Sequence, residues 1–87
     1  MKRISVVIPL FNEKRSLIGL YAELSEEIEE HNAEFEIIFV DDGSNDDSFE
    51  MLKSIAREDA RVRVIKFRRN FGKSAALSAG FRESTGE

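Results

Sequence analysis

Apolar residues along the chain form three short runs, the first two nearly continuous, that alternate with three segments of helical periodicity. β-Branched and aromatic side chains dominate the runs, which cover residues 4–8, 35–40 and 62–67. Continuous runs of this kind are typical of strands covered on both faces of a parallel sheet, and Pro9 is expected to close the first one. Arg63 and Lys66 interrupt the third run, which therefore predicts a half-exposed strand near an edge of the sheet.

The segments between and after these runs predict three helices. Leucines recur at three- and four-residue steps through residues 13–31, as on the buried face of an amphipathic helix. Asp46, Asp47 or Ser48 can cap the second helix. Small residues mark the third helix, over residues 72–82, as one that packs closely against a sheet.

This β-α-β-α-β-α order with short connections predicts one α/β domain over residues 1–87, with right-handed crossovers. We expect three layers: a parallel sheet of three strands in the order 3-2-1 and helices that flank it, as in half of a Rossmann-like fold. The loops after parallel strands gather at one edge of the sheet, where ligands bind. They are residues 9–13, 41–47 and 68–73.

Composition excludes several classes of function. The net charge is −4, from 13 basic and 17 acidic residues, so no nucleic-acid partner is expected. The chain has no cysteine, which excludes disulfides and thiolate metal sites. Its single histidine, His31, is predicted to lie at the surface and is far in sequence from the loop edge, which argues against a Ser-His-Asp triad. The first apolar run is too short for a signal peptide or a membrane span, which favours a cytoplasmic location.

Charged residues are also unevenly distributed. Glutamates crowd residues 23–36 and are interpreted as the solvated face of a helix. Basic residues crowd residues 61–73, where solvated surface and a ligand site remain equal alternatives.

The second loop contains the strongest candidate ligand groups. Asp41 and Asp42 stand side by side at the exit of a strand and precede Gly43. Such carboxylates can accept hydrogen bonds from a base, a ribose or a metal-bound water, although a turn followed by a helix cap explains the same residues. Because adjacent carboxylates repel each other and a turn requires one of them, the pair favours a ligand.

The first and third loops add weaker candidates. Phe11 can stack on a base or belong to the core, Glu13 can reach ribose hydroxyls, and Asn12 is expected to cap a helix. Cations beside Gly72 at the start of a helix suit a phosphate group. Gly72-Lys73-Ser74 is not a P-loop, because the glycine required five positions before Gly72 is replaced by Phe67.

Several blocks of the sequence, in this order, resemble the start of family 2 glycosyltransferases with the GT-A fold. The resemblance is closest to the branch that loads a sugar onto a polyprenyl phosphate, which includes dolichyl-phosphate mannosyltransferases and undecaprenyl-phosphate glycosyltransferases. The blocks are Ile4 to Pro9, Asn12-Glu13, Val40 to Asp46, Arg69 to Lys73, Ala75 to Leu77 and Ala79 to Phe81.

The resemblance implies transfer of a hexosyl group from a nucleoside diphosphate sugar to an acceptor, a polyprenyl phosphate or a saccharide. The nucleotide-binding residues that it implies are Pro9, Phe11, Glu13, Asp41, Asp42, Asn70, Gly72 and Lys73. Phe11 departs from the tyrosine common in the family. The family's Asp-x-Asp motif, which holds Mg²⁺ or Mn²⁺, is expected beyond Glu87 in a longer parent, so we expect no metal and no catalytic residue in this chain.

Two other functions and one physical consequence follow from the sequence. A nucleotidyltransferase or another nucleotide-binding α/β protein would share the same loop edge, and a non-catalytic binding module would retain the fold alone. In the longer parent, a position at the inner face of the membrane is expected. The first strand would be an apolar edge in the isolated chain, which predicts self-association.

Overall fold

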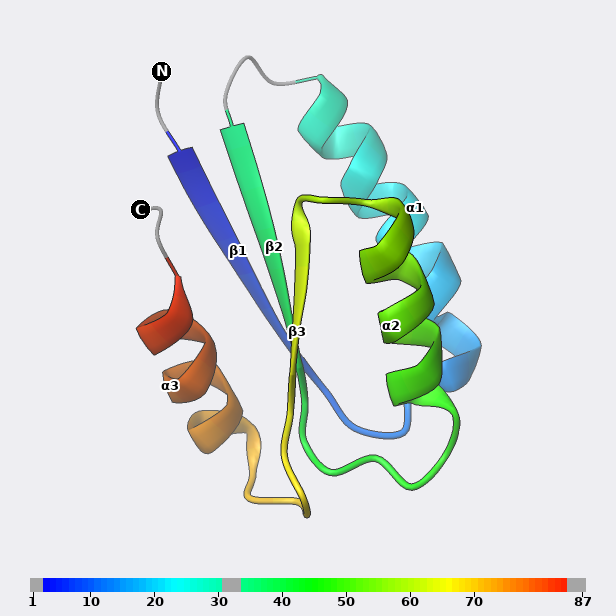
Figure 1. Cartoon of the computed structure of the whole chain (residues 1–87), viewed down its shortest axis with the longest axis vertical. Helices are drawn as coiled ribbons and strands as arrows, with labels where there is room; N and C mark the ends of the chain where they lie inside the picture. The colour runs from blue at the N-terminus through cyan, green and yellow to red at the C-terminus, as the bar shows by residue number, and fades with distance from the viewer. Residues whose placement is uncertain (1–2, 31–33, 85–87) are drawn as a thin grey trace.

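The computed structural model describes residues 3–30 and 34–84, in which three strands and three helices alternate along the chain (Figure 1). The predicted His31 surface position lies outside the described residues. The elements are β1 (Arg3–Leu10), α1 (Lys14–Glu29), β2 (Glu34–Asp41), α2 (Ser48–Glu58), β3 (Val62–Lys66) and α3 (Lys73–Glu83).

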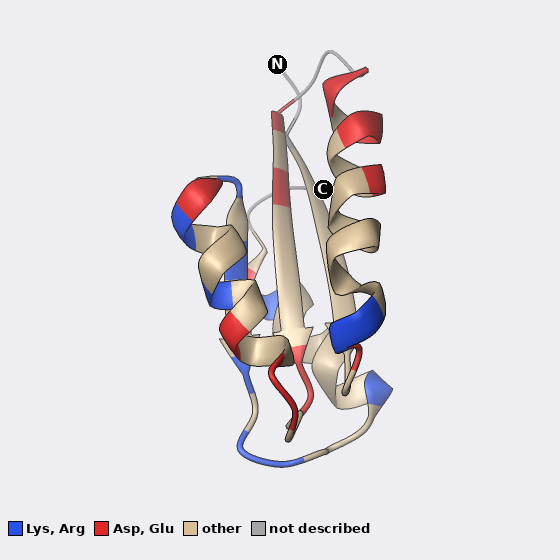
Figure 2. Ribbon diagram, turned by 90° about the vertical axis from the view of Figure 1, so that its right-hand side faces the viewer, with Lys and Arg blue, Asp and Glu red and all other residues tan. Residues whose placement is uncertain are grey.

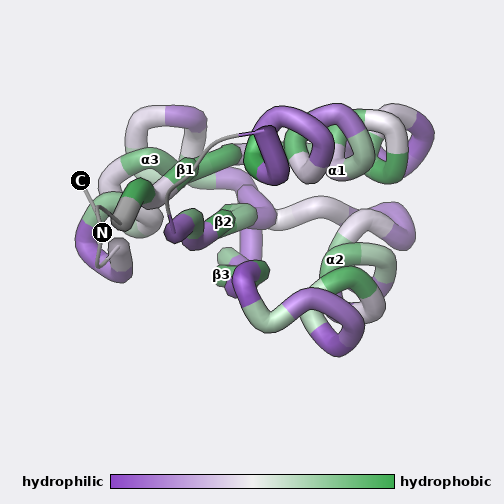
Figure 3. The backbone as a smooth tube through the Cα atoms, turned by 90° about the horizontal axis from the view of Figure 1, so that it is seen from above, coloured by the Kyte–Doolittle hydropathy of each residue, from purple (hydrophilic) through white to green (hydrophobic). Residues whose placement is uncertain are grey.

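The three strands form a parallel sheet in the order β1-β2-β3, which confirms the predicted fold class and strand order. Helices α1 and α2 cover one face of the sheet, and α3 covers the other (Figure 3). The strand at the centre, β2, is buried on both faces. Its side chains alternate, so that Ile37 and Phe39 pack with Leu17 and Leu52, while Val40 packs with the α3 side.

Strand β1 is longer than its apolar run predicts, because it continues through Pro9 to Leu10. Asp42 N–H donates to Leu10 O, and in a parallel ladder alternate residues direct their backbone groups to the same neighbour. Pro9 nitrogen therefore falls on the side of β1 away from β2. A proline interrupts strand pairing where a neighbouring strand would accept a hydrogen bond from its missing N–H. Pro9 nitrogen points away from β2, so the pairing of β1 with β2 continues past it.

Close packing of α3 on the sheet depends on small side chains. Ala76, Ala79 and Gly80 are buried on this helix. A Cβ atom added at Gly80 would clash with Val7 Cγ1 and would lie 3.3 Å from Val40 Cγ2. The helix therefore approaches β1 and β2 more closely than a larger residue would allow.

The prediction that the glutamates of residues 23–36 form a solvated helix face is wrong for Glu36. This residue lies in β2 with 2% of its surface exposed. Its Oε2 accepts a hydrogen bond from Ser5 Oγ at 2.7 Å, and its Oε1 accepts one from Arg63 Nη1 at 2.9 Å. Arg63 Nη1 also donates to Glu83 O at 2.8 Å. This polar group joins all three strands to the C-terminal end of α3.

A second polar cluster connects α1 to the turn between α2 and β3. Arg61 donates to Asp59 through Nε at 2.9 Å and Nη2 at 2.7 Å, and Tyr21 O–H donates to Asp59 Oδ2 at 2.6 Å. The Arg61 hydrogen bonds, followed by that of Tyr21, hold the pKa of Asp59 well below its ordinary value. The hydrogen bond to Asp59 raises the pKa of Tyr21.

The remaining ends agree with the predicted elements to within a few residues. Helix α2 begins after Asp47, although Asp47 makes no capping hydrogen bond with its side chain, and Asp46 Oδ1 instead accepts one from Ser48 N–H. Strand β3 is half-exposed, as Arg63 and Lys66 predict.

Among the described residues, no helix has the length and apolar character needed to cross a membrane.

Replacing Asp59 with asparagine tests the second cluster. The folded-state pKa of Asp59 lies below its unfolded value, so the carboxylate stabilises the fold above about pH 4 and this contribution declines as the pH falls further. We expect Asp59→Asn to lower the free energy of unfolding at pH 7 by about 1–2 kcal/mol. In urea titrations at several pH values, the difference from wild type should shrink below pH 4. A difference that is constant from pH 7 to pH 2.5, or equal to that of the exposed control Glu58→Gln, would contradict this assignment.

The free side of β1 leads to a second expectation. Strand β2 is its one neighbour in the described sheet, so Val7 directs its backbone groups away from any described strand. We expect the 87-residue chain to associate as its concentration rises, with protection of the Val7 amide from hydrogen exchange. Sedimentation equilibrium between 10 and 500 μM would measure this, and a monomer throughout that range would show the prediction to be wrong.

Candidate functional site

The loops that follow the three strands meet at the carboxyl edge of the sheet, as predicted. Asn12 N–H donates to Ser44 Oγ at 2.8 Å, and Asn45 N–H donates to Asn12 Oδ1 at 2.9 Å. Lys14 Nζ lies 2.8 Å from Asp47 Oδ2, and this hydrogen bond raises the pKa of Lys14. The first two loops are therefore fixed to each other by direct contacts.

Asn12 differs from its predicted role as a helix cap. Glu13 occupies the N-cap position of α1, and Asn12 lies before it with φ of 51°. Asparagine tolerates this left-handed conformation better than most residues. Its side chain thereby reaches across to the second loop instead of the start of its own helix.

Asp42 connects the second loop to the third. Its Oδ1 accepts a hydrogen bond from Phe71 N–H at 2.8 Å, and its Oδ2 accepts one from Gly72 N–H at 3.0 Å. The residue is 4% exposed. These bonds place its carboxylate at the N-terminal end of α3, where the helix dipole favours a negative charge.

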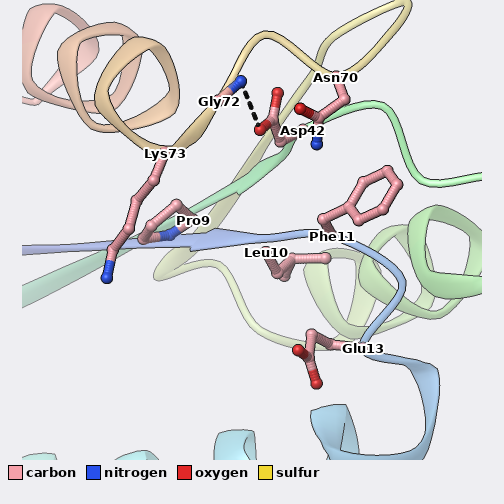
Figure 4. Close-up of a pocket in the computed structure, with 8 residues that line it drawn as sticks. All are labelled: Pro9, Leu10, Phe11, Glu13, Asp42, Asn70, Gly72 and Lys73. Atoms are coloured by element: carbon pink, nitrogen blue, oxygen red, sulfur yellow. Dashed lines mark hydrogen bonds between the residues drawn. The ribbon is translucent and has the colours of Figure 1, made fainter.

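A pocket of ≈ 370 Å³ lies where the three loops meet. Figure 4 shows its wall, which combines the end of β1, Asp42 and the loop that leads into α3. Glu13, Asn70 and Lys73 are exposed, and the Phe11 ring is 41% exposed. The lining residues are Pro9, Leu10, Phe11, Glu13, Asp42, Asn70, Gly72 and Lys73.

Seven of the eight predicted site residues line this pocket, and Asp41 does not. Asp41 is the last residue of β2 and is fully buried, on the same face as Phe39. Its Oδ1 accepts a hydrogen bond from Ser44 N–H at 2.9 Å, and its Oδ2 has no hydrogen-bond partner among the described residues. Strand alternation therefore separates the two aspartates: Asp41 fixes the turn, and Asp42 reaches the pocket.

Leu10 lines the pocket but was not among the predicted site residues. The signal that could have identified it is its position between Pro9 and Phe11, at the end of the first strand. A strand that ends at Pro9 would leave Leu10 in the loop, where polar and aromatic side chains are the stronger candidates for ligand contact.

The third loop and the residue before it carry aromatic and basic side chains. The rings of Phe67 and Phe71 meet edge to face with centroids 5.6 Å apart, and the Arg69 guanidinium lies 4.8 Å from the Phe71 centroid. Figure 2 shows that this loop is basic, whereas acidic residues gather at the C-terminal half of α1. The pocket thus has one cation, Lys73, on its third loop and the carboxylates of Glu13 and Asp42 on its first and second.

The family model described as "Glycosyl transferase family 2" matches residues 5–87. The chain belongs to glycosyl transferase family 2. The resemblance to this family, carried by the sequence blocks between Ile4 and Phe81, is thereby confirmed.

Named relatives and solved structures agree with this assignment. Undecaprenyl-phosphate 4-deoxy-4-formamido-L-arabinose transferases from Proteus mirabilis and Pseudomonas fluorescens are 40% and 41% identical to this glycosyltransferase chain, over 100% and 97% of its length. The chain spans 27% and 25% of those two relatives, or about a quarter of each.

Among solved structures, TarS of S. aureus superimposes with a TM-score of 0.82 at 24% identity, which shows a shared fold. The mannosyltransferase PcManGT from Pyrobaculum calidifontis, solved in complex with GDP-Man and Mn²⁺, superimposes with a TM-score of 0.74 at 26% identity. Each structure is matched over 25% of its own chain, and they cover 100% and 98% of this one.

The approach of the second loop to the third can be tested at Gly43. Its φ is 78°, and an added Cβ would clash with the Arg69 carbonyl carbon and lie 2.5 Å from Asn70 nitrogen. We expect Gly43→Ala to displace the third loop, weaken the hydrogen bonds of Asp42, and lower the free energy of unfolding by about 2–4 kcal/mol. Urea denaturation and the amide shifts of Phe71 and Gly72 would measure both effects.

Gly72→Ala is the matched control. Gly72 has φ of 100°, but an added Cβ would meet no atom within 4 Å, so this variant introduces backbone strain without a clash. We expect the smaller loss, about 1–2 kcal/mol. Equal losses in the two variants would show that strain alone, and not the contact with the third loop, explains the requirement for Gly43.

Proposed function

We propose that this chain is the nucleotide-binding part of an enzyme that transfers a hexosyl group from a nucleoside diphosphate sugar to a polyprenyl phosphate. The observation that carries the proposal is the pocket in which Glu13, Asp42 and Lys73 converge from three separate loops. Family membership and the names of the undecaprenyl-phosphate transferases support the substrate class.

The proposed contacts follow from the position of each group. Phe11 and Pro9 border the base, Glu13 accepts hydrogen bonds from ribose hydroxyls, and Lys73 approaches the diphosphate. Asp42 already accepts two backbone hydrogen bonds. Because a carboxylate offers about four acceptor sites, Asp42 retains capacity for an N–H of the base.

Asn70 and Gly72 complete the proposed nucleotide side of the pocket. Gly72 is the N-cap of α3 and has no capping side chain, so the first turn of the helix is left accessible to an anion. A diphosphate placed there would gain from the helix dipole as well as from Lys73.

The acceptor determines whether the transfer needs a general base. The bond between the anomeric carbon and the diphosphate oxygen breaks, and its electron pair leaves with the diphosphate. A phosphate oxygen of the acceptor forms the new bond. Because the second pKa of a phosphate monoester is about 6, this oxygen is ionised at neutral pH and requires no general base. The proposal is thus compatible with a chain that supplies no catalytic residue.

The described residues contain no cluster of three or more histidine, cysteine, aspartate or glutamate side chains that could hold a metal ion. We propose that Mg²⁺ or Mn²⁺ in the whole protein binds through other residues, and the Mn²⁺ in PcManGT supports this expectation. A polyprenyl phosphate acceptor would place the protein at the inner face of the membrane.

Calorimetric titration of the full chain with UDP, GDP, their hexose conjugates and the triphosphates UTP and GTP tests the proposal. We expect one nucleoside diphosphate sugar to bind, and Lys73→Met and Glu13→Gln to weaken it about 10- to 100-fold by removing charge-assisted contacts. Arg82→Met, at the other end of α3, is the control and should bind as wild type does. Binding of a nucleoside triphosphate alone would indicate a nucleotidyltransferase, and binding of no nucleotide by the folded protein would leave a non-catalytic module.

A further inference from the structure

A second concave surface lies on the other side of the molecule from α3, between α2 and the outer strand β3. Its volume is ≈ 540 Å³. Apolar groups form its floor, and basic side chains surround them. The floor consists of Phe49, Ala56, Val62 and Val64, and the rim includes Lys53 and Arg57. Arg63 also lines the groove, but its guanidinium is bonded to Glu36 and Glu83 on the α3 side of the sheet. We call this surface the α2–β3 groove.

One wall of the groove is a strand edge with available backbone groups. Ile37 N–H donates to Arg61 O, and Phe67 N–H donates to Asp41 O, so the odd-numbered residues of β3 face β2. In a parallel ladder the intervening residues direct N–H and C=O the other way. The outward groups of Val64 and Lys66 have no hydrogen-bond partner among the described residues.

The charge at the groove is also unbalanced. Lys66 Nζ lies 4.5 Å from the Phe49 centroid and Lys53 Nζ lies 5.2 Å from it, so two ammonium groups lie near this ring. Lys53 pairs with Glu50 at 3.4 Å. Arg57 and Lys66 pair with no acidic group in the described part of the chain, and each is exposed.

From these features we propose that the α2–β3 groove binds an extended acidic segment of a partner protein, which adds a strand beside β3. Its backbone would pair with Val64 and Lys66, its apolar residues would cover the floor, and its carboxylates would meet Arg57 and Lys66. Strand addition of this kind derives affinity from main-chain hydrogen bonds and specificity from alternate side chains. The proposal does not depend on the proposed glycosyl transfer.

Two other occupants fit these observations less well. A second copy paired through its own β3 would put Arg57 and Lys66 of both copies on one face of the joined sheet with no carboxylate to meet them, and like charges across a strand pair are destabilising. An anionic membrane would satisfy the cations but not the backbone groups of β3, which need donors and acceptors arranged along a strand.

The test uses fluorescence anisotropy of the full chain with a labelled peptide of Thr-Val-Thr-Glu repeats, in which valine and glutamate share the face of the added strand that meets α2, and with a matched peptide of Thr-Val-Thr-Lys repeats. We expect the acidic peptide to bind and the basic peptide not to bind. Arg57→Glu/Lys66→Glu should weaken binding of the acidic peptide at least tenfold and should gain binding of the basic peptide. Binding of the basic peptide by this variant would show that the variant is folded and that its loss of acidic-peptide binding is an effect of charge.

Of two further variants, one tests the backbone contact and the other is a control for net charge. Val64→Pro removes an outward N–H while leaving the bonds to β2, so it should weaken peptide binding about tenfold with the thermal transition retained. Arg15→Glu/Arg82→Glu changes net charge equally, outside the groove, and should bind as wild type does.

Three outcomes would overturn the proposal. They are no binding of the acidic peptide by the folded chain, equal binding by the Arg57→Glu/Lys66→Glu variant, and binding of vesicles containing 30% phosphatidylserine that depends on Arg57 and Lys66 without peptide binding. If the acidic peptide does not bind, Arg57 and Lys66 would be explained as charges that protect an exposed strand edge against aggregation.

Discussion

The pocket depends on one buried carboxylate that serves two loops. Asp42 follows β2 directly, and its two oxygens accept the N–H groups of Phe71 and Gly72. A buried carboxylate is costly unless hydrogen bonds satisfy it, and the start of α3 supplies both donors together with a favourable dipole. Because Gly43 has no side chain, the third loop can approach closely enough for these bonds to form. The position of Lys73 relative to Glu13 follows from this contact.

The fold was predictable because hydrophobic burial determines most of it. Both faces of β2 are covered, so its sequence is a continuous apolar run, and strand order followed from the short crossovers. Glu36 shows where this reasoning stops. A glutamate within a run of glutamates predicts a solvated position, but Glu36 is buried because Ser5 and Arg63, distant in sequence, provide its hydrogen bonds. Partners of this kind are visible only after the chain has folded.

The candidate site was predictable to the level of the loop but not to the level of the individual carboxylate. The sequence places Asp41 and Asp42 together, yet one turns to the α1 and α2 face and the other to the pocket, because side chains alternate at a strand end. Deciding between them requires knowing where the strand stops to within one residue. The same uncertainty applies to Leu10, which belongs to β1 although the strand was predicted to end at Pro9, and to Asn12, whose left-handed backbone turns its side chain away from α1.

Helix α3 carries one wall of the pocket, and its attachment explains why polar groups at both of its ends matter. Its buried residues, Ala76, Ala79 and Gly80, contribute little apolar area, and hydrophobic stabilisation scales with the area removed from water. Directional contacts must therefore fix its position along the sheet. Asp42 holds the N-terminal end, and Arg63, itself bound to Glu36, holds the C-terminal end through Glu83 O. The small residues allow the helix to lie close to β1, while the polar contacts determine where along β1 it lies. Lys73 is thus placed by groups at opposite ends of the sheet.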